Sequence, residues 1–402
     1  MLNLVKWVII KLKMEFKKQL VKFYKTNFKL KKFYNHTPII DIEEQNELVK
    51  CIKSTFVSTV GSQTKKFEKQ LINLTKSRYI IPVNTGTSAL HLCLLANDIN
   101  EDHEVLVPSI SFVATTNSIM YVNANPHFID VSIGDLTIDF EKLDRYLEKF
   151  KFKKGFLYNP KTNKYIKALI VLHTFGYMAN MQKAKKISKK YNLVLIEDAA
   201  EALGSYYKKS HAGTIGKCGI LSFNGNKVVT TGAGGALLTN NKRIYEKALH
   251  LSQVAKINKP YIFDYSEIGY NYRMPNLNAS LGVSQLKKFR KILNLKSKLH
   301  NKYKFFFKSI KNYKLVIESK HTKSNHWLNT IIIHKKNVDE KFQFFFLNEL
   351  NKKNIQIRPM WKPMHKLNYL KKFPRMNLSN TNYLENRVYN LPSAPEIMIH
   401  EK

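Results

Sequence analysis

Cysteine is scarce in this chain, and so are acidic residues. Its 402 residues include three cysteines, Cys51, Cys93 and Cys218. Their odd number and wide spacing match neither a disulfide framework nor a metal-ligand pattern. We therefore expect a reducing, cytoplasmic environment and no metal site.

Long apolar runs are absent as well. The longest early run, residues 4–10, contains Lys6 and is far shorter than the about 20 apolar residues that span a bilayer. It lacks a basic segment before it and a small-residue cleavage site, so we expect neither an integral membrane segment nor a signal peptide. Residues 1–35 form a basic, amphipathic N-terminal extension. We expect a surface helix there; a peripheral membrane contact and a start at Met14 are the alternatives.

The shortage of acidic residues leaves a large positive charge. Lys and Arg number 67 against 29 Asp and Glu, which gives a net charge of +38. A basic regulator that binds nucleic acid is one interpretation. The lysines are scattered rather than gathered on one stripe, however, and Asn, Ile, Phe and Tyr are also abundant, as in an AT-rich genome. We favour that second interpretation and expect no nucleic-acid partner.

The middle of the chain alternates between strand and helix patterns. This alternation predicts an α/β fold with a largely parallel sheet, whose ligands bind at the carboxyl ends of the strands. Helices are also expected at residues 40–54 and 62–76. The expected strands are residues 79–83, 104–107, 127–131, 168–173 and 194–197, and the helices between them are residues 89–96, 114–122 and 182–191.

After residue 271 the pattern changes. Helices are expected at residues 275–293 and on to 311, strands at 313–318 and 327–334, and a helix at 339–353. We interpret this part as a smaller α+β domain. The predicted organisation is an extension at residues 1–35, a large domain at 36–280 and a small C-terminal domain at 281–402.

Two motifs at predicted strand ends indicate a phosphate-bearing ligand. In NTGTSA, Gly86 opens a helix whose free N–H groups, with the hydroxyls of Thr87 and Ser88, form a cup for phosphate. An ordinary helix cap explains the same pattern. In SFNGNK, Ser222 precedes Lys227, which lies in a polar turn between apolar strands. A solvated loop lysine is the alternative for Lys227.

An acidic turn completes the pattern. Asp198 follows a buried strand and is suited to hold a protonated pyridine nitrogen, although an N-cap role also fits. Glu201 is within reach of a phenolic oxygen, and Phe112 is suited to stack on a ring unless it is simply core. A lysine, an acid and phosphate donors at strand ends together predict a pyridoxal phosphate (PLP) site.

In this order the motifs resemble the DegT/DnrJ/StrS family of PLP-dependent sugar aminotransferases. The resemblance covers about residues 38–392. It implies fold type I, with a mostly parallel seven-stranded sheet in the large domain, a smaller C-terminal domain, and a homodimer with shared active sites. The matching segments are VNTGTSALHL, VLVPSISFVATTNSI, IEDAAEALGS, HAGTIGKCGILSFNGNKVVTTGAGG and IGYNYRMPNLNASLG.

The resemblance assigns a role to each matching residue. Lys227 corresponds to the catalytic Schiff-base lysine, and Asp198 to the partner of the pyridine nitrogen. Glu201 stands where the family usually has glutamine, so the chain departs from the family pattern at this cofactor-contact position. The cofactor-binding positions are Gly86, Thr87, Ser88, Phe112, Asp198, Glu201, Ser222, Lys227 and, reaching over from the partner subunit, Asn271. Family members that are dehydratases carry histidine in place of the lysine, so Lys227 favours transamination.

Further segments resemble the legionaminic-acid subgroup of this family: FVSTVGSQTKKFE, SNHWLNTIII and IRPMWKPMHKL. That resemblance implies transfer of an amino group from glutamate to C4 of a UDP-linked 4-keto-6-deoxy-N-acetylhexosamine, in the biosynthesis of surface polysaccharide. A different nucleotide keto sugar, or a dehydratase reaction, is the alternative. The residues expected to contact substrate are His173, Arg273, His326, Trp327, Arg358 and Trp361, with His365 nearby.

Overall fold

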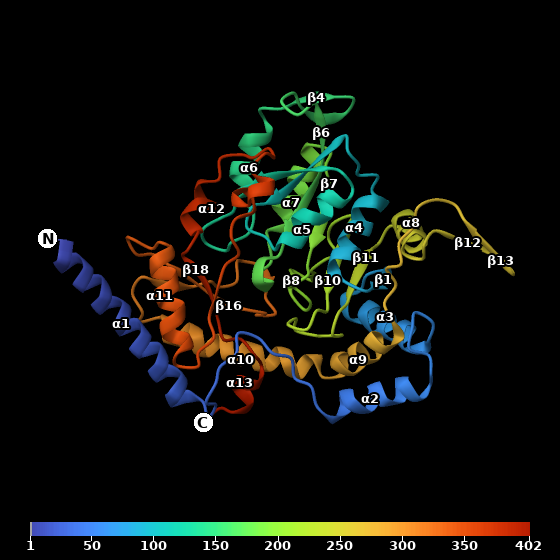
Figure 1. Ribbon diagram of the computed structural model, residues 1–402. Helices are drawn as coiled ribbons and strands as arrows, with labels where there is room; N and C mark the ends of the chain where they lie inside the picture. Colours follow the sequence, from blue (N-terminus) through green and yellow to red (C-terminus); the bar gives the residue numbers. More distant parts are fainter. Residues whose placement is uncertain (1) are drawn as a thin grey trace.

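A central mixed sheet carries helices on its faces (Figure 1). The computed structural model describes residues 2–402, with side chains from Glu15 onward except that of Asn258. The main path of the sheet runs β1 (Tyr79–Val83), β11 (Gly235–Thr239), β10 (Cys218–Ser222), β7 (Val194–Asp198), β6 (Lys164–Leu172), β2 (His103–Pro108) and β3 (Asn125–Ile129).

Strand β11 alone runs against the other strands of this path. It pairs antiparallel with β1 and β10, whereas β10–β7, β7–β6, β6–β2 and β2–β3 are parallel. The predicted mostly parallel seven-stranded sheet is therefore confirmed. Two strands beyond it, β4 (Lys151–Lys153) and β5 (Phe156–Asn159), extend the sheet through β6.

Several helices of this part begin at a residue whose side chain caps the first turn. The Thr85 side chain accepts a hydrogen bond from Ser88 N–H at the start of α4, and Asp139, Asn180 and Asn241 act in the same way for α6, α7 and α8. These helices are α2 (Ile42–Lys53), α3 (Ser62–Thr75), α4 (Gly86–Ala96), α5 (Val113–Tyr121), α6 (Phe140–Leu147), α7 (Met181–Lys190) and α8 (Lys242–Ser252).

A second, smaller core lies in the C-terminal part. The sheet order there is β14 (Tyr313–Leu315), β16 (Asn329–Ile333), β18 (Val388–Leu391) and β17 (Arg358–Pro359). The helices in this part of the sequence are α9 (Asn276–Lys287), α10 (Phe289–Phe307), α11 (Glu340–Asn351), α12 (Ser379–Leu384) and α13 (Glu396–Ile399). Helices α9 and α12 bury their apolar residues in the larger core instead. Short elements complete the chain: β8 (Tyr206–Tyr207), β9 (Ser210–His211), β15 (Thr322–Lys323), η1 (Thr174–Gly176), η2 (Met364–Lys366) and η3 (Asn368–Leu370).

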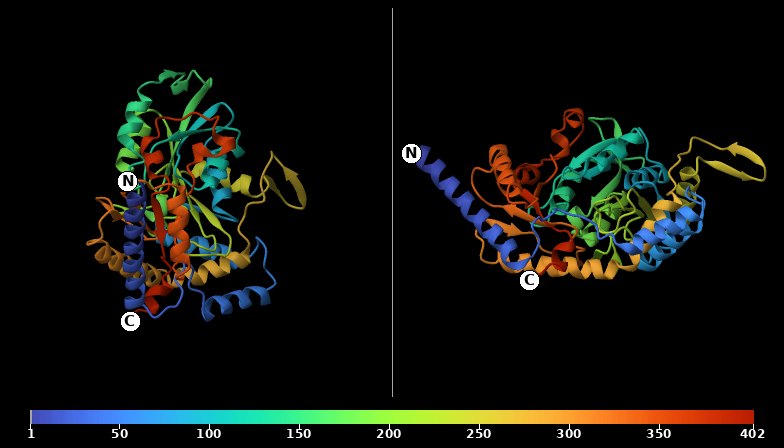
Figure 2. Two further views of the ribbon diagram at one scale, coloured as in Figure 1. Left: turned by 60° about the vertical axis from the view of Figure 1, so that its left-hand side comes forward. Right: turned by 60° about the horizontal axis from the view of Figure 1, so that its bottom comes forward.

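The N-terminal extension packs on this second core. Helix α1 (Leu2–Asn27) buries Phe16 and Tyr24 against side chains from α10 and β14. Helices α9 and α10 run consecutively beneath the main sheet (Figure 2). The division at residues 35 and 280 stays a prediction. The larger hydrophobic core also takes in Leu328, Leu384 and Val388, and the smaller one joins Phe16 and Tyr24 to the C-terminal part.

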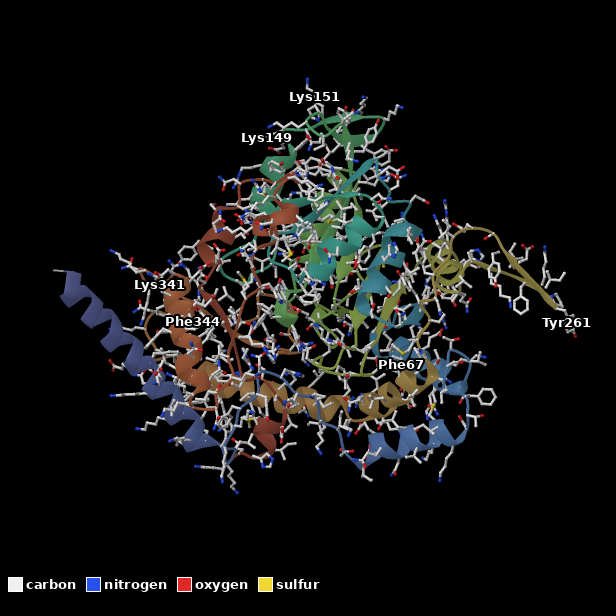
Figure 3. All side chains as sticks on the ribbon, in the orientation of Figure 1. Phe67, Lys149, Lys151, Tyr261, Lys341 and Phe344 are labelled. Carbon is white, nitrogen blue, oxygen red and sulfur yellow. The ribbon has the colours of Figure 1, made fainter. Side chains whose placement is uncertain are left out.

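One hairpin stands away from the body of the protein. Strands β12 (Lys256–Lys259) and β13 (Ile262–Tyr265) project beyond α8, with Tyr261 at the tip (Figure 3). Neither this hairpin nor the β4–β5 hairpin was predicted from the sequence. Within the described residues, the structure holds no helix with the length and apolarity needed to cross a membrane.

Candidate functional site

A cavity of about 360 Å³ opens at the carboxyl ends of the central strands. Strand β7 ends at Asp198 and β10 ends at Ser222, and both residues line the cavity. The turn after β1 contributes Gly86 and Thr87. Residues far apart in the sequence therefore meet where the parallel topology predicts a ligand site.

Lys227 lies in a tight turn at one side of this cavity. Its N–H donates to the Asn224 carbonyl at 2.9 Å. The Lys227 Nζ atom lies 3.5 Å from Glu201 Oε1 and 3.9 Å from the centre of the Trp327 ring. Trp327 is held in turn by its indole N–H, which donates to the Asn226 carbonyl at 2.8 Å. The lysine is thus positioned by a carboxyl and an aromatic face rather than free in solvent.

Asp198 is buried at the end of β7. Its carboxylate accepts a hydrogen bond from the Thr115 hydroxyl at 2.7 Å and from Ala200 N–H at 3.1 Å. Burial raises its pKa, and these hydrogen bonds and the nearby Lys227 only partly offset that rise. A cation placed against Asp198 would lower the pKa again, so the site favours a positively charged partner such as a protonated ring nitrogen.

Glu201 lies between the lysine and a neighbouring loop. Its Oε2 accepts a hydrogen bond from Phe175 N–H at 2.8 Å, and its Oε1 faces Lys227 Nζ. Burial raises the pKa of Glu201 to about 7, although Lys227 and the Phe175 N–H oppose the rise. Near neutral pH this carboxyl can therefore accept or donate a hydrogen bond.

The first turn of α4 forms a close-packed cradle in the same cavity. A Cβ atom on Gly86 would come within 3.0 Å of Ser222 Cβ, and one on Gly235 within 2.5 Å of Gly86 N. The absence of these side chains leaves backbone N–H groups at a helix N-terminus beside the Thr87 and Ser222 hydroxyls, an arrangement that suits a phosphate. A phosphate cradle, a buried acid and a lysine in one cavity fit PLP.

Two aromatic rings and a cation form the outer wall. Phe112 lies 6.2 Å from Trp361 between ring centres, and Trp361 lies 4.8 Å from Phe175. Arg358 lines the same cavity from β17 in the C-terminal part. The outer wall therefore presents aromatic ring faces and one positive charge to a bound ligand.

Some predicted site residues do not line this cavity as the structure describes it. Ser88 uses its hydroxyl within the α4 cap, where it contacts Asn84 and Thr85. Asn271 lies on a bridge to Gln253. Arg273 bridges Val83 and lies near Glu68.

His173 belongs to a buried network behind the cavity. Its Nδ1 accepts a hydrogen bond from Ala179 N–H at 3.3 Å, and its Nε2 contacts Glu197 Oε2 at 3.0 Å. Burial alone would raise the Glu197 pKa, but the hydrogen bonds from His173 and from the backbone of Gly213 and Gly216 leave that pKa lowered. Both ring nitrogens of His173 are therefore occupied within the fold.

His326 and His365 also point elsewhere. His326 lines a separate cavity on the far side of its loop, whereas the next residue, Trp327, lines the cavity of Lys227. His365 Nδ1 contacts the Ser109 hydroxyl at 2.7 Å. Of the residues expected to contact substrate, Trp327, Arg358 and Trp361 share one cavity with Lys227.

Sequence reasoning missed several side chains that line this cavity. Thr115 is the most informative, because it binds Asp198 across 83 residues of sequence. A threonine in the first turn of a helix that follows a strand end was the available signal, but it does not identify a partner. Thr85, Asn224 and Asn226 also line the cavity.

Comparison with known proteins gives a consistent family relationship. The model of the DegT/DnrJ/EryC1/StrS aminotransferase family matches residues 38–401. GDP-perosamine synthase of Escherichia coli O157:H7 is 32% identical over 364 residues, which cover 90% of this chain and 93% of that protein. A Campylobacter jejuni UDP-4-amino-4,6-dideoxy-N-acetyl-beta-L-altrosamine transaminase is 29% identical, covering 92% and 94%.

Solved structures share the fold. A Streptococcus pneumoniae protein solved in its PLP form superposes with a TM-score of 0.79, covering 89% of this chain and 92% of that one at 22% identity. The overall fold of this chain thus has a known structural counterpart.

Proposed function

The chain belongs to the DegT/DnrJ/EryC1/StrS aminotransferase family, and we propose that it transfers an amino group from glutamate to C4 of a UDP-linked 4-keto-6-deoxy-N-acetylhexosamine. At the level of the family, the protein is a PLP-dependent sugar aminotransferase that acts on nucleotide sugars. The donor, the nucleotide and the position of amination are the proposed part.

One observation carries the mechanism: Lys227, Asp198 and Glu201 converge on one cavity beside a phosphate cradle. PLP, when bound, supplies a conjugated ring that accepts the electron pair released from the carbon bearing the amino group. Asp198 would hold the ring nitrogen protonated. Gly86, Thr87 and Ser222 would hold the phosphate, and Phe112 would cover the ring face.

Lys227 is the proposed proton carrier. Its Nζ would take the proton from the glutamate carbon that bears the amino group, and in the second half of the reaction it would return a proton to C4 of the sugar. Glu201 and Trp327 hold this Nζ from two sides. Glu201 would contact the phenolic oxygen of the cofactor, a contact for which its pKa of about 7 allows it to donate.

The outer wall supports a nucleotide-linked substrate. Arg358 would pair with a diphosphate or carboxylate, and Trp361 would stack on the base or the sugar. The relatives include both GDP- and UDP-sugar enzymes. The UDP assignment and the place in legionaminic acid or related surface polysaccharide biosynthesis rest on the motif resemblance, with another nucleotide keto sugar as the alternative.

A homodimer with shared active sites is part of the proposal. Asn271 does not line the cavity of its own chain in the described structure, which supports a role toward the partner's phosphate. The β12–β13 hairpin carries exposed apolar residues that a second copy would cover, among them Tyr261 and Phe263. The three cysteines are buried and unpaired within the described structure, which supports the proposed cytoplasmic location.

A substrate comparison tests the proposal. Holoenzyme is incubated with glutamate and either a UDP-linked 4-keto-6-deoxy-N-acetylhexosamine or a GDP-linked 4-keto-6-deoxyhexose, and 2-oxoglutarate is quantified. We expect faster release with the UDP sugar and an amino sugar as the product. Faster release with the GDP sugar would overturn the UDP assignment. Loss of water from the sugar without an amino product would overturn transamination.

A further inference from the structure

A second cavity, of about 530 Å³, lies on the other side of the loop that holds Trp327. One wall is a single polar face of α10, formed at helical spacing by Arg290, Asn294, Ser297, Asn301 and Lys304. The opposite wall is the segment at residues 317–326, which contributes Glu318, Lys323 and His326. The cavity shares no lining residue with the cavity of Lys227.

Positive charge dominates this cavity. Arg290, Lys304 and Lys323 line it against the single carboxylate of Glu318. Among the described residues, none of the three cations forms an ion pair with an acidic side chain. Glu318 instead lies 3.6 Å from His326 Nε2. These three cations, contributed by two walls, give the cavity a net positive charge that no neighbouring carboxylate of the described residues neutralises.

The floor of the cavity is a stacked pair of histidines. The rings of His300 and His326 lie 4.0 Å apart at an interplanar angle of 11°. His300 is fixed through its Nδ1, which contacts Asn329 Oδ1 at 2.8 Å. His326 Nδ1 is buried and has no hydrogen-bond partner in the described structure. Unsatisfied buried polar atoms are rare in folded proteins and call for an explanation.

The backbone at this point is strained. His326 has φ of +48°, in the left-handed region that a residue with a Cβ seldom adopts. Such strain persists where surrounding contacts impose it, and it clusters at binding sites. The neighbouring Asn325 helps to fix this backbone conformation of His326, because its side-chain amide donates to the carbonyls of Glu201 and Leu203 at 2.9 and 3.0 Å.

We propose that this second cavity binds a phosphate-bearing metabolite of nucleotide size, at a site separate from the cavity of Lys227. Guanidinium and ammonium groups favour phosphate oxygens. Asn294, Asn301 and Ser297 add neutral donors along the same wall. The volume falls in the range of small-molecule sites, about 300–1,000 Å³, and exceeds what a single inorganic phosphate fills.

The position of the site couples it to the catalytic cavity. His326 faces the second cavity, and the next residue, Trp327, packs against Lys227 Nζ. Asn325 holds the loop of Glu201 at the same time. An anion bound to the segment at residues 318–326 would therefore contact the loop that carries Trp327 and holds the loop of Glu201. Trp327 and Glu201 are the two residues that position Lys227.

Pyrophosphate binding to the PLP-loaded protein tests the proposal by calorimetry. The double variant Arg290→Gln/Lys304→Gln removes two cations of the cavity. The matched control, Lys291→Gln/Lys298→Gln, removes two exposed cations of the same helix that do not line the cavity. We expect saturable binding to the wild type, at least about tenfold weaker binding to the first variant, and a change of less than about twofold in the control.

Two further variants define where the anion binds. Lys323→Gln, on the opposite wall, should also weaken binding. Arg358→Gln, which removes the cation proposed to pair with a diphosphate in the cavity of Lys227, should leave unchanged the binding event that Arg290→Gln/Lys304→Gln weakens. Equally weakened pyrophosphate binding in Arg290→Gln/Lys304→Gln and in Lys291→Gln/Lys298→Gln would mean that only the overall charge of the protein matters, and it would overturn the proposal. Loss of binding in Arg358→Gln alone, or no saturable binding to the wild type, would overturn it as well. Circular dichroism verifies that each variant is folded.

Discussion

The pKa of Glu201 should differ between the folded and the unfolded chain, and this difference makes the stability of the fold depend on pH. Burial raises its pKa from 4.5 to about 7. A carboxyl with a raised pKa favours the folded state fully below its unfolded value, and this contribution is lost as the pH rises through the folded pKa. The relevant window runs from about pH 4.5 to about 7.

We predict that Glu201→Gln removes this pH dependence in the protein without added PLP. Relative to the variant, the wild type should lose up to about 3 kcal/mol of unfolding free energy across that window, because the charged carboxylate becomes costly to bury. Urea unfolding from about pH 5 to 8 measures the difference. Glu267→Gln, which changes an exposed carboxyl, should follow the wild type. Parallel curves for wild type and Glu201→Gln would contradict the argument.

His173 illustrates a residue whose environment, not its type, decides its role. The resemblance suggested a place near the substrate, but the structure puts both ring nitrogens in hydrogen bonds with Glu197 and Ala179. We predict that His173→Ala lowers stability by about 1–3 kcal/mol, because it leaves a buried carboxylate short of a partner.

Thermal unfolding and steady-state kinetics together test the His173 prediction. The structural role predicts a lower unfolding temperature with little change in KM for the nucleotide sugar. The control His321→Ala changes an exposed histidine and should alter neither. A KM raised several-fold at unchanged stability would restore the substrate-binding interpretation.

At the scale of elements, the contact between β11 and the start of α4 decides how well the phosphate cradle is formed. A Cβ atom on Gly235 would lie within 2.5 Å of Thr85 O and Gly86 N, which are backbone atoms with little freedom to move. We predict that Gly235→Ala displaces the first turn of α4 and weakens PLP binding at least about tenfold, a cost of about 1.4 kcal/mol. Fluorescence titration with PLP measures the affinity.

Gly134→Ala is the matched control for Gly235→Ala. A Cβ atom there would meet only Ser132 Oγ at 3.8 Å, so PLP affinity should stay at the wild-type value. Unchanged affinity in Gly235→Ala would contradict the importance of this contact.

The elements that could be predicted from sequence are those with a strong local signal. Asn180 caps the predicted helix at residues 182–191, and apolar runs such as residues 194–197 form buried strands. Helices α6 and α8 were not predicted, although Asp139 and Asn241 cap them. The β12–β13 hairpin was missed because its strands are short and its apolar residues face solvent rather than a core. The second cavity was missed because the helical spacing of Arg290 and Lys304 does not show that they face Lys323.

The site likewise divides into residues with a local sequence signal and residues that only tertiary contacts bring together. Lys227, Asp198 and Ser222 follow apolar strands, so topology alone brings them together. Thr115 and the two-sided loop at His326 and Trp327 depend on tertiary contacts. His326 and Trp327 are consecutive but line different cavities, and no sequence pattern indicates which residue faces which cavity.

At the scale of the whole molecule, the projecting hairpin predicts the oligomeric state. Tyr261 and Phe263 are 103% and 80% exposed, which is unfavourable for apolar rings in an isolated chain. We predict that Tyr261→Ser/Phe263→Ser shifts a dimer toward monomer by at least about tenfold in Kd and lowers activity, because Asn271 would no longer reach the partner's site. Sedimentation velocity measures the change.

A surface phenylalanine elsewhere serves as the control for the hairpin. Phe152→Ser removes an exposed ring from β4 and should leave the sedimentation coefficient unchanged. A wild-type protein that is monomeric at all concentrations would contradict the shared active site.

The most direct test of the account is the visible absorbance of the PLP-loaded protein before and after glutamate is added. We expect a cofactor band that glutamate shifts toward the pyridoxamine form in the wild type. In Lys227→Ala the rate of that shift should fall by about 10²–10⁴-fold, the contribution of a positioned proton-transfer group. The exposed-lysine variant Lys209→Ala should match the wild type. A band that glutamate leaves unchanged in the wild type, or full activity in Lys227→Ala, would contradict the account.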